Sequence, residues 1–260
     1  MRTRLMVFPL IAAVLCAWAL AAADQTKTAK PSASEKDAKD QCDKGNICLR
    51  YGLTDEAIRY GNLAVSLDPN HYGGHRLLGN AYYKKGDLVQ AVAEFEKAAA
   101  LKPDLAEAHF ALGLALFDSG ETDRAEKEFS QAGAIQEDSL TSYYLARVHF
   151  KQKKFEQAFD EVQRSIKKNP KAPGAYNLKG VILNELKRYA EAAGSFQAGL
   201  ILSPDDLNLQ INLGIAYINS NEPAKAKPVL EKVLPRIEDA ALKAKIEDYL
   251  KSIKAPGGRL

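Results

Sequence analysis

The sequence predicts an all-α protein: a right-handed α-solenoid of about six helix–turn–helix units with a C-terminal capping helix. Three observations lead to this prediction. Small, aromatic and proline positions recur together about every 34 residues between Ala38 and Leu234. Each period contains two amphipathic stretches separated by a turn. One helical hairpin cannot bury both of its apolar faces, so such units are expected to stack into a continuous core.

The strongest copy of the repeat, Tyr72–Leu105, shows how one unit is built. Its first stretch carries apolar residues at spacings of one, three and four, which is typical of a helix. Gly86 and Asp87 follow, because glycine tolerates a positive φ and aspartate suits the cap of the next helix. Pro103 ends the second stretch, since proline cannot continue a helix.

In the second to sixth units, one position in each first helix and one in each second helix is kept small. A small residue lets two backbones approach closely, and a neighbouring aromatic or leucine side chain fills the remaining gap. The first-helix set is Gly79, Gly113, Ala146, Gly180 and Gly214, and the second-helix set is Ala91, Ala125, Ala158, Ala192 and Ala226.

This pattern resembles the tetratricopeptide repeat over about three quarters of the chain. Two departures stand out: Glu137 replaces the proline that ends the third unit, and Pro228 falls inside the second helix of the sixth unit. We expect Pro228 to kink that helix or delay its start. The units are expected at residues 38–71, 72–105, 106–138, 139–172, 173–206 and 207–240.

The N-terminus has the features of a secretory signal peptide over residues 1–23. Arg2 and Arg4 precede an apolar run, Leu5–Leu20, which small residues follow. The run is shorter than the roughly 20 residues that a spanning helix needs. We therefore expect cleavage and a secreted or periplasmic protein without a membrane span, the alternative being an N-terminal membrane anchor.

The segments next to the repeats are also readable. Residues 24–37 are rich in Lys, Thr, Ser, Ala and Asp and are expected to form a disordered leader. Residues 239–253 place apolar side chains on one helix face and charged ones on the other, which is typical of a capping helix. Residues 254–260 are expected to form a tail.

Composition and motifs argue against several functions. Removing the signal peptide leaves 34 basic against 33 acidic residues, so nothing indicates a nucleic-acid partner. We find no phosphate-binding loop, metal motif or nucleophile elbow, and we interpret the histidines as packing residues. The sequence therefore predicts no enzyme, cofactor or metal. An enzyme with an unrecognised site stays the least favoured alternative.

Cys42 and Cys48 leave two alternatives open. Within a helix their Cα atoms would lie about 9 Å apart, beyond the roughly 7 Å that a disulfide can bridge. A helix and a disulfide therefore exclude each other at this place. The turn-like sequence of residues 43–46 favours a small disulfide loop, whereas the repeat register favours the helix.

The resemblance implies that the first helices line a concave groove. In the second to fourth units, the groove positions combine aromatic side chains with cations, which are favoured binding anchors. We expect an extended or helical protein segment to bind there, with the cations orienting its acidic groups. The alternative for the aromatics is packing between helices. The predicted groove residues are Arg76, Asn80, Tyr83, Lys84, Phe110, Leu114, Phe117, Tyr143, Arg147, Phe150 and Lys151.

These expectations together predict a non-catalytic scaffold for protein–protein interaction that belongs to a periplasmic or envelope assembly of a bacterium. The alternative is a pilotin-like factor for pilus or secretin assembly, which the size and repeat number resemble. Pilotins are lipoproteins, however, and Leu15 stands before Cys16 where a lipoprotein signal would have a small residue.

Overall fold

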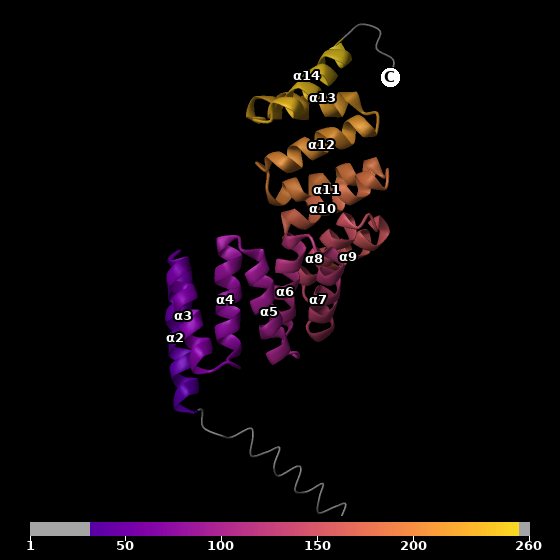
Figure 1. Ribbon diagram of the computed structural model, residues 1–260. Helices are drawn as coiled ribbons and strands as arrows, with labels where there is room; N and C mark the ends of the chain where they lie inside the picture. The colour runs from indigo at the N-terminus through magenta and orange to yellow at the C-terminus, as the bar shows by residue number, and fades with distance from the viewer. Residues whose placement is uncertain (1–31, 255–260) are drawn as a thin grey trace, which may run out of the picture. The chain divides into compact units, whose positions relative to one another are not determined.

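The computed structural model describes residues 32–254, and the regular elements in that range are all helical (Figure 1). The chain divides into two structural units, called the first unit (Met1–Ala81) and the second unit (Tyr82–Leu260), whereas the 34-residue copies are called repeats. The expected signal peptide, residues 24–31 of the leader and residues 255–260 of the tail lie outside the described residues. No helix between residues 32 and 254 combines the length and the apolar character needed to cross a membrane.

The first unit contains α2 (Ala33–Arg50), α3 (Thr54–Leu67) and most of α4 (Tyr72–Lys85). The expected disordered leader extended to residue 37, but α2 already begins at Ala33. Ser32 caps this helix, and its hydroxyl oxygen accepts a hydrogen bond of 3.1 Å from the backbone N–H of Glu35. Serine followed three residues later by glutamate is a helix-start signal, which the polar composition of the leader concealed.

Helix α2 runs without interruption through Cys42 and Cys48, and both are free thiols. Of the two alternatives, the structure therefore adopts the helix, which holds the cysteines too far apart for a disulfide. Gly45 between them serves close packing rather than a turn, because a Cβ there would lie 2.3 Å from Leu77 Cδ2. Burial raises the pKa of the Cys42 thiol, which disfavours the reactive thiolate.

From α5 onward the second unit contains alternating second and first helices of the repeats, followed by α14. The turn after a first helix uses a left-handed residue, which is Gly120 after α6 but Lys153, Lys187 and Asn221 after the next three first helices. The helices are α5 (Leu88–Leu101), α6 (Ala106–Ser119), α7 (Thr122–Ile135), α8 (Ser139–Lys151), α9 (Phe155–Lys168), α10 (Pro173–Glu185), α11 (Tyr189–Leu202), α12 (Leu207–Asn219), α13 (Pro223–Val233) and α14 (Ala240–Lys254).

The small positions pack as predicted in the second unit. A large buried side chain of the second helix lies directly against the glycine of the first helix, so the two backbones approach closely. A Cβ added at Gly113 would lie 2.8 Å from the nearest ring atom of its partner. A Cβ added at Gly180 or at Gly214 would lie 2.4 Å from the nearest side-chain atom of its partner. The pairs are Gly113 with Phe129, Gly180 with Phe196 and Gly214 with Leu230.

The early histidines have a structural role beyond packing. In four repeats a side chain in the first turn of the first helix hydrogen-bonds to a proline carbonyl in the preceding turn. His75 and His109 are both buried and supply two of these bonds. The bonds are His75 Nε2 to Pro69 O at 2.9 Å, His109 Nε2 to Pro103 O at 2.9 Å, Tyr176 Oη to Pro170 O at 3.2 Å and Gln210 Nε2 to Pro204 O at 2.7 Å.

The C-terminal end differs from expectation at one proline. Pro228 does not delay α13, which begins at Pro223 and contains Pro228 in its interior. Pro223 occupies the first helical turn, where proline's fixed φ favours helix initiation. Helix α14 begins one residue after the expected start of the capping helix. Its Ile246 and Leu250 are buried in the apolar cluster of the preceding helices.

Candidate partner-binding groove

The predicted groove residues of the second unit gather around Phe117 of α6. Arg147 and Lys151 are four residues apart on α8 and so share one helix face. The Arg147 Cζ lies 4.8 Å from the centroid of the Phe117 ring, and the Lys151 Nζ lies 4.9 Å from it. Phe117 itself is only 7% exposed. The packing alternative therefore holds for Phe117, and the side chains that cover it are cations.

Tyr144 joins this cluster although the sequence did not predict it as a groove residue. Its ring stacks on Phe129 at 5.4 Å and meets Phe110 edge-on at 5.5 Å. The Arg147 Cζ lies 5.1 Å from the Tyr144 centroid. A signal for this was available, because Tyr144 and Arg147 are three residues apart and therefore neighbours on a helix.

Tyr83, at the end of α4, is held by an acidic side chain of the same unit. Its hydroxyl donates a hydrogen bond to the Asp118 carboxylate. Burial, together with this hydrogen bond and the negative charge, raises the pKa of Tyr83 to about 12. The phenol is therefore neutral at physiological pH and holds Asp118 at the edge of the cation cluster.

Arg147 and Lys151 differ from Arg124 of the preceding repeat in having no acidic partner within residues 32–254. Neither forms an ion pair with a carboxylate of the described residues, and Lys151 Nζ donates instead to the Phe117 carbonyl at 3.4 Å. By contrast, Arg124 on α7 contacts the carboxylates of Glu96 and Glu121. The positive charge of α8 is thus left available for a ligand.

The remaining predicted residues have varied surroundings. Tyr143 and Phe150 are half-buried, and the Phe150 ring packs 5.7 Å from that of Phe155 on α9. Leu114 is half-buried and Lys84 is exposed. Arg76 and Asn80 belong to the first unit, where both are half-buried and Arg76 lies over the Tyr72 ring at 5.9 Å.

The cluster on α6 and α8 consists of cations and aromatic rings. Within residues 32–254, no three His, Cys, Asp or Glu side chains converge as a metal site would require. The cluster instead offers two cations held over aromatic rings, a geometry in which the ring faces attract the positive charge.

Comparison with known proteins agrees with this architecture. Models of the tetratricopeptide repeat match residues 79–120, 143–206 and 183–246. No curated protein matches the chain. The stacked helical hairpins and their paired small and large positions define an all-helical solenoid. With these matches, its units are identified as tetratricopeptide repeats.

Solved structures with the same fold extend over most of the chain. The structure of Pseudomonas aeruginosa PilF has a TM-score of 0.72 at 16% identity and covers 84% of this chain and 99% of that one. A chain of the APC/C heterotetramer Cut9–Hcn1 has a TM-score of 0.65 at 21% identity. That match covers 84% of this chain but only 43% of the other. YrrB, described as having an unusual peptide-binding site, has a TM-score of 0.61 at 21% identity over 72% of this chain and 97% of its own. At these identities the likeness concerns the fold.

Proposed function

We propose that the chain is a non-catalytic scaffold that binds an acidic segment of a partner protein along α6 and α8. Tetratricopeptide-repeat proteins bind protein or peptide partners. The observation that supports this site is the pair Arg147 and Lys151, which lie over aromatic rings without a carboxylate partner among the described residues. Their charge attracts an acidic ligand, and their side chains are already ordered by the rings.

The geometry suggests how such a segment binds. Arg147 offers a planar fork that can hold one carboxylate through two hydrogen bonds. Lys151 lies one helical turn further along α8 and can pair with a second acidic group. The half-buried Phe110 and Tyr143 provide apolar contact beside the cations. Phe117 supports the cations from below and is not itself an anchor for the ligand.

A binding measurement with defined peptides tests this proposal. The probe is a short fluorescein-labelled peptide that alternates glutamate with leucine, and its binding to the full chain is followed by anisotropy. We expect Arg147→Gln to weaken binding about tenfold, because a charge-assisted hydrogen bond is lost. Arg124→Gln is the matched control, since Arg124 is already paired with acids. Equal affinity in both variants would show that α8 is not the site.

We further propose export and a role in assembling a periplasmic or envelope complex. This proposal rests on the signal-like residues 1–23. A pilotin-like role is the second candidate, favoured by a fold likeness to PilF that extends over 99% of that chain. Mass spectrometry of the protein from a secreting host tests export. A mature chain beginning near Asp24 supports it, and an intact N-terminus found only in the cytoplasm contradicts it.

Catalysis is the least favoured function. Burial raises the pKa of Glu161 on α9, a shift of the kind found at active sites. The Arg164 guanidinium, however, lies 2.7 Å from the Glu161 carboxylate and opposes this shift. The ion pair between Glu161 and Arg164 explains the presence of both charged groups on α9 without a catalytic role. Tetratricopeptide-repeat proteins are also generally non-catalytic.

A further inference from the structure

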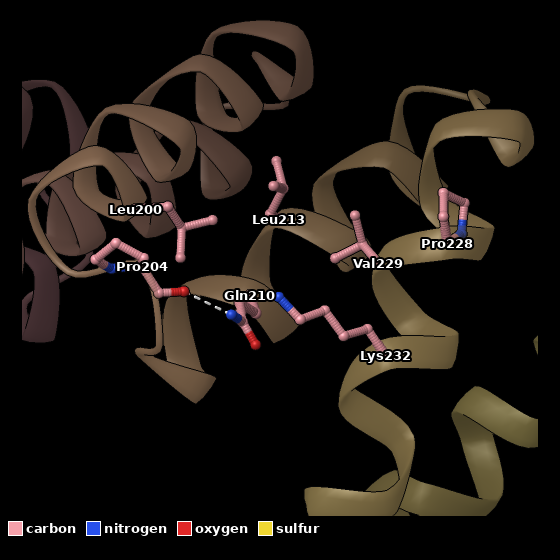
Figure 2. A pocket seen from close by; sticks show the side chains of 7 residues that line it. All are labelled: Leu200, Pro204, Gln210, Leu213, Pro228, Val229 and Lys232. Atoms are coloured by element: carbon pink, nitrogen blue, oxygen red, sulfur yellow. Dashed lines mark hydrogen bonds between the residues drawn. The ribbon is translucent and has the colours of Figure 1, made fainter.

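Helices α11, α12 and α13 enclose a mainly apolar recess of 310 Å³. Figure 2 shows the Lys232 side chain extending from α13 toward α12, with its ammonium group at the edge of this recess. The other lining residues are Leu200, Pro204, Gln210, Leu213, Pro228 and Val229. The recess has room for one or two apolar side chains.

This recess is separate from the predicted groove. The tetratricopeptide-repeat resemblance places Ile215 and Ile218 of α12 toward the concave face, whereas the recess is lined by Gln210 and Leu213. Because successive residues of a helix are about 100° apart, these two pairs point to different faces of α12. A ligand in the recess and a ligand in the groove would therefore contact different sides of the second unit.

An equivalent recess occurs two repeats earlier, but its lining side chains carry different charges. Helices α7, α8 and α9 form a recess of 370 Å³ at equivalent repeat positions. There Glu161 stands where Val229 is found, and Arg164 stands where Lys232 is found. The Arg164 guanidinium lies 2.7 Å from Glu161, so the earlier recess satisfies its own charges. The backbone of the repeat thus forms the recess, and the lining side chains determine whether its charged groups are paired.

In the α11–α13 recess the acidic member of this pair is missing. With Val229 in place of an acid, Lys232 makes no ion pair with any carboxylate among the described residues. The recess therefore combines apolar walls with one positive charge, that of Lys232, and an acidic group on a ligand would complement that charge.

The floor of the recess is held in place before any ligand arrives. Arg236 donates a hydrogen bond of 3.0 Å to Gln210 Oε1, and its other terminal nitrogen donates to the Asp205 carbonyl at 3.0 Å. The Gln210 amide in turn donates to the Pro204 carbonyl at 2.7 Å, as drawn in Figure 2. These bonds fix the polar groups away from the apolar walls, which lowers the ordering cost of binding.

Two aliphatic residues that follow the lining residue Leu200 at the end of α11 are also exposed. Ile201 is 81% exposed and Leu202 is 39% exposed, although both are large aliphatic residues. Exposed aliphatic area next to an apolar recess is typical of a site that a partner covers. Pro228 adds to it, because proline presents a carbon ring and no N–H donor.

We propose that the α11–α13 recess is a second docking site, which takes a leucine or phenylalanine side chain from an acidic partner segment. The apolar side chain fills the space between Leu213 and Val229, and a neighbouring carboxylate pairs with Lys232. This site does not depend on the groove proposed above, because that groove lies along α6 and α8 and shares no residue with the recess.

Nuclear magnetic resonance of the full chain tests this inference. The probe is a peptide in which one phenylalanine is flanked by aspartates, and its partner peptide carries lysines in place of the aspartates. We expect the acidic peptide to shift the resonances of Val229, Leu213 and Lys232, and the lysine peptide to leave them unchanged. Shifts confined to α8, equal shifts with both peptides, or no shift with either would each overturn the inference.

Two variants separate the apolar and the charged part of the site. Val229→Trp fills the recess and should abolish the shifts, while Lys232→Glu should weaken binding about tenfold through charge reversal. Lys127→Glu on α7 is the matched control, because it changes the same charge on an exposed surface of another repeat. Circular dichroism confirms that each variant is folded. Arg147→Gln should leave this binding unchanged even if the groove proposal fails.

Discussion

Two pairs of first helices make the same inter-repeat contact with different side chains. The contact between α6 and α8 is aromatic, whereas the contact between α10 and α12 is a hydrogen bond between amides. On α8, Tyr144 reaches the fifth position of the preceding first helix, where its ring lies 5.5 Å from that of Phe110. On α12, Asn212 occupies the same repeat position and donates a hydrogen bond of 2.9 Å to Asn177, again at the fifth position. The backbone geometry of the repeat is thus independent of which interaction fills it.

The surroundings of the two contacts follow the same division. Arg147 lies over the Tyr144 ring of the first contact, whereas Ile215 occupies the equivalent repeat position on α12. Beneath both contacts lies the same small–large pair, a glycine against a buried phenylalanine. The difference teaches that the regular positions determine the stacking, while the irregular positions determine what each part of the surface can bind.

The largest expected effect tests whether both regions share this core. In Gly180→Ala the new Cβ would lie 2.4 Å from a ring atom of Phe196, which is fully buried. We expect a loss of about 1–3 kcal/mol in the free energy of unfolding from overpacking. Gly113→Ala should lose less, because its Cβ would lie 2.8 Å from Phe129. Hydrogen exchange resolves the two regions, since the repeats of a solenoid can open separately.

Gly194→Ala is the control for this comparison. It lies on α11 with no atom within 4 Å of the added Cβ, so the substitution should stabilise the helix by about 1 kcal/mol. If Gly180→Ala were as stabilising as Gly194→Ala, the inference that Gly180 packs closely against Phe196 would be wrong.

A double-mutant cycle compares the two inter-repeat contacts directly. Asn212→Ala should cost about 1 kcal/mol, because the Asn177 carbonyl oxygen loses its donor. Asn177→Ala should lower the free energy of unfolding less in the Asn212→Ala variant than in the wild-type chain. The difference is the coupling energy, which we expect to be about 0.5–1 kcal/mol. The cycle of Phe110→Leu and Tyr144→Leu should give a coupling of about 0.5–1.5 kcal/mol. Urea denaturation of the single and double variants supplies the values. Additive costs in either cycle would show that its contact is incidental.

The sequence predicted what depends on regular spacing and missed what depends on contacts between helices. Gly180 against Phe196 was foreseen, because a small and a large position recur in register. The choice at Cys42 and Cys48 depended on Gly45, whose role is a contact with Leu77 on another helix. The arrangement of the candidate site was also hard to predict, because it too depends on contacts between helices.

Two parts of the candidate site illustrate this. Arg147 was predicted from its repeat position, but the burial of Phe117 follows from side chains that α8 lays over it. Tyr144 and Asn212 were both missed, because the sixth repeat position was not among those expected to face the groove. The aromatic and amide character of that position becomes meaningful only once its partner on the preceding helix is known.

The smallest expected effect concerns Tyr83, which adds to the first region a hydrogen bond to Asp118. Tyr83→Phe should cost about 0.5 kcal/mol, at the lower end for a hydrogen bond because the tyrosine is only half-buried. It should also change the alkaline behaviour. The pKa of Tyr83 is raised from its ordinary value of 10.0 to about 12, so the folded state favours the neutral phenol. Its contribution is fully present below pH 10 and is lost as the pH rises toward 12.

The wild-type chain should therefore lose stability more steeply than Tyr83→Phe above pH 10, as thermal unfolding followed by circular dichroism can show. Tyr51→Phe serves as the control, because Tyr51 is 80% exposed and should leave the slope unchanged. An identical slope in wild type and Tyr83→Phe would mean that the hydroxyl does not hold Asp118 in solution. The cation cluster of α8 would then be bordered by a free carboxylate, which would compete with an acidic ligand for Arg147 and Lys151.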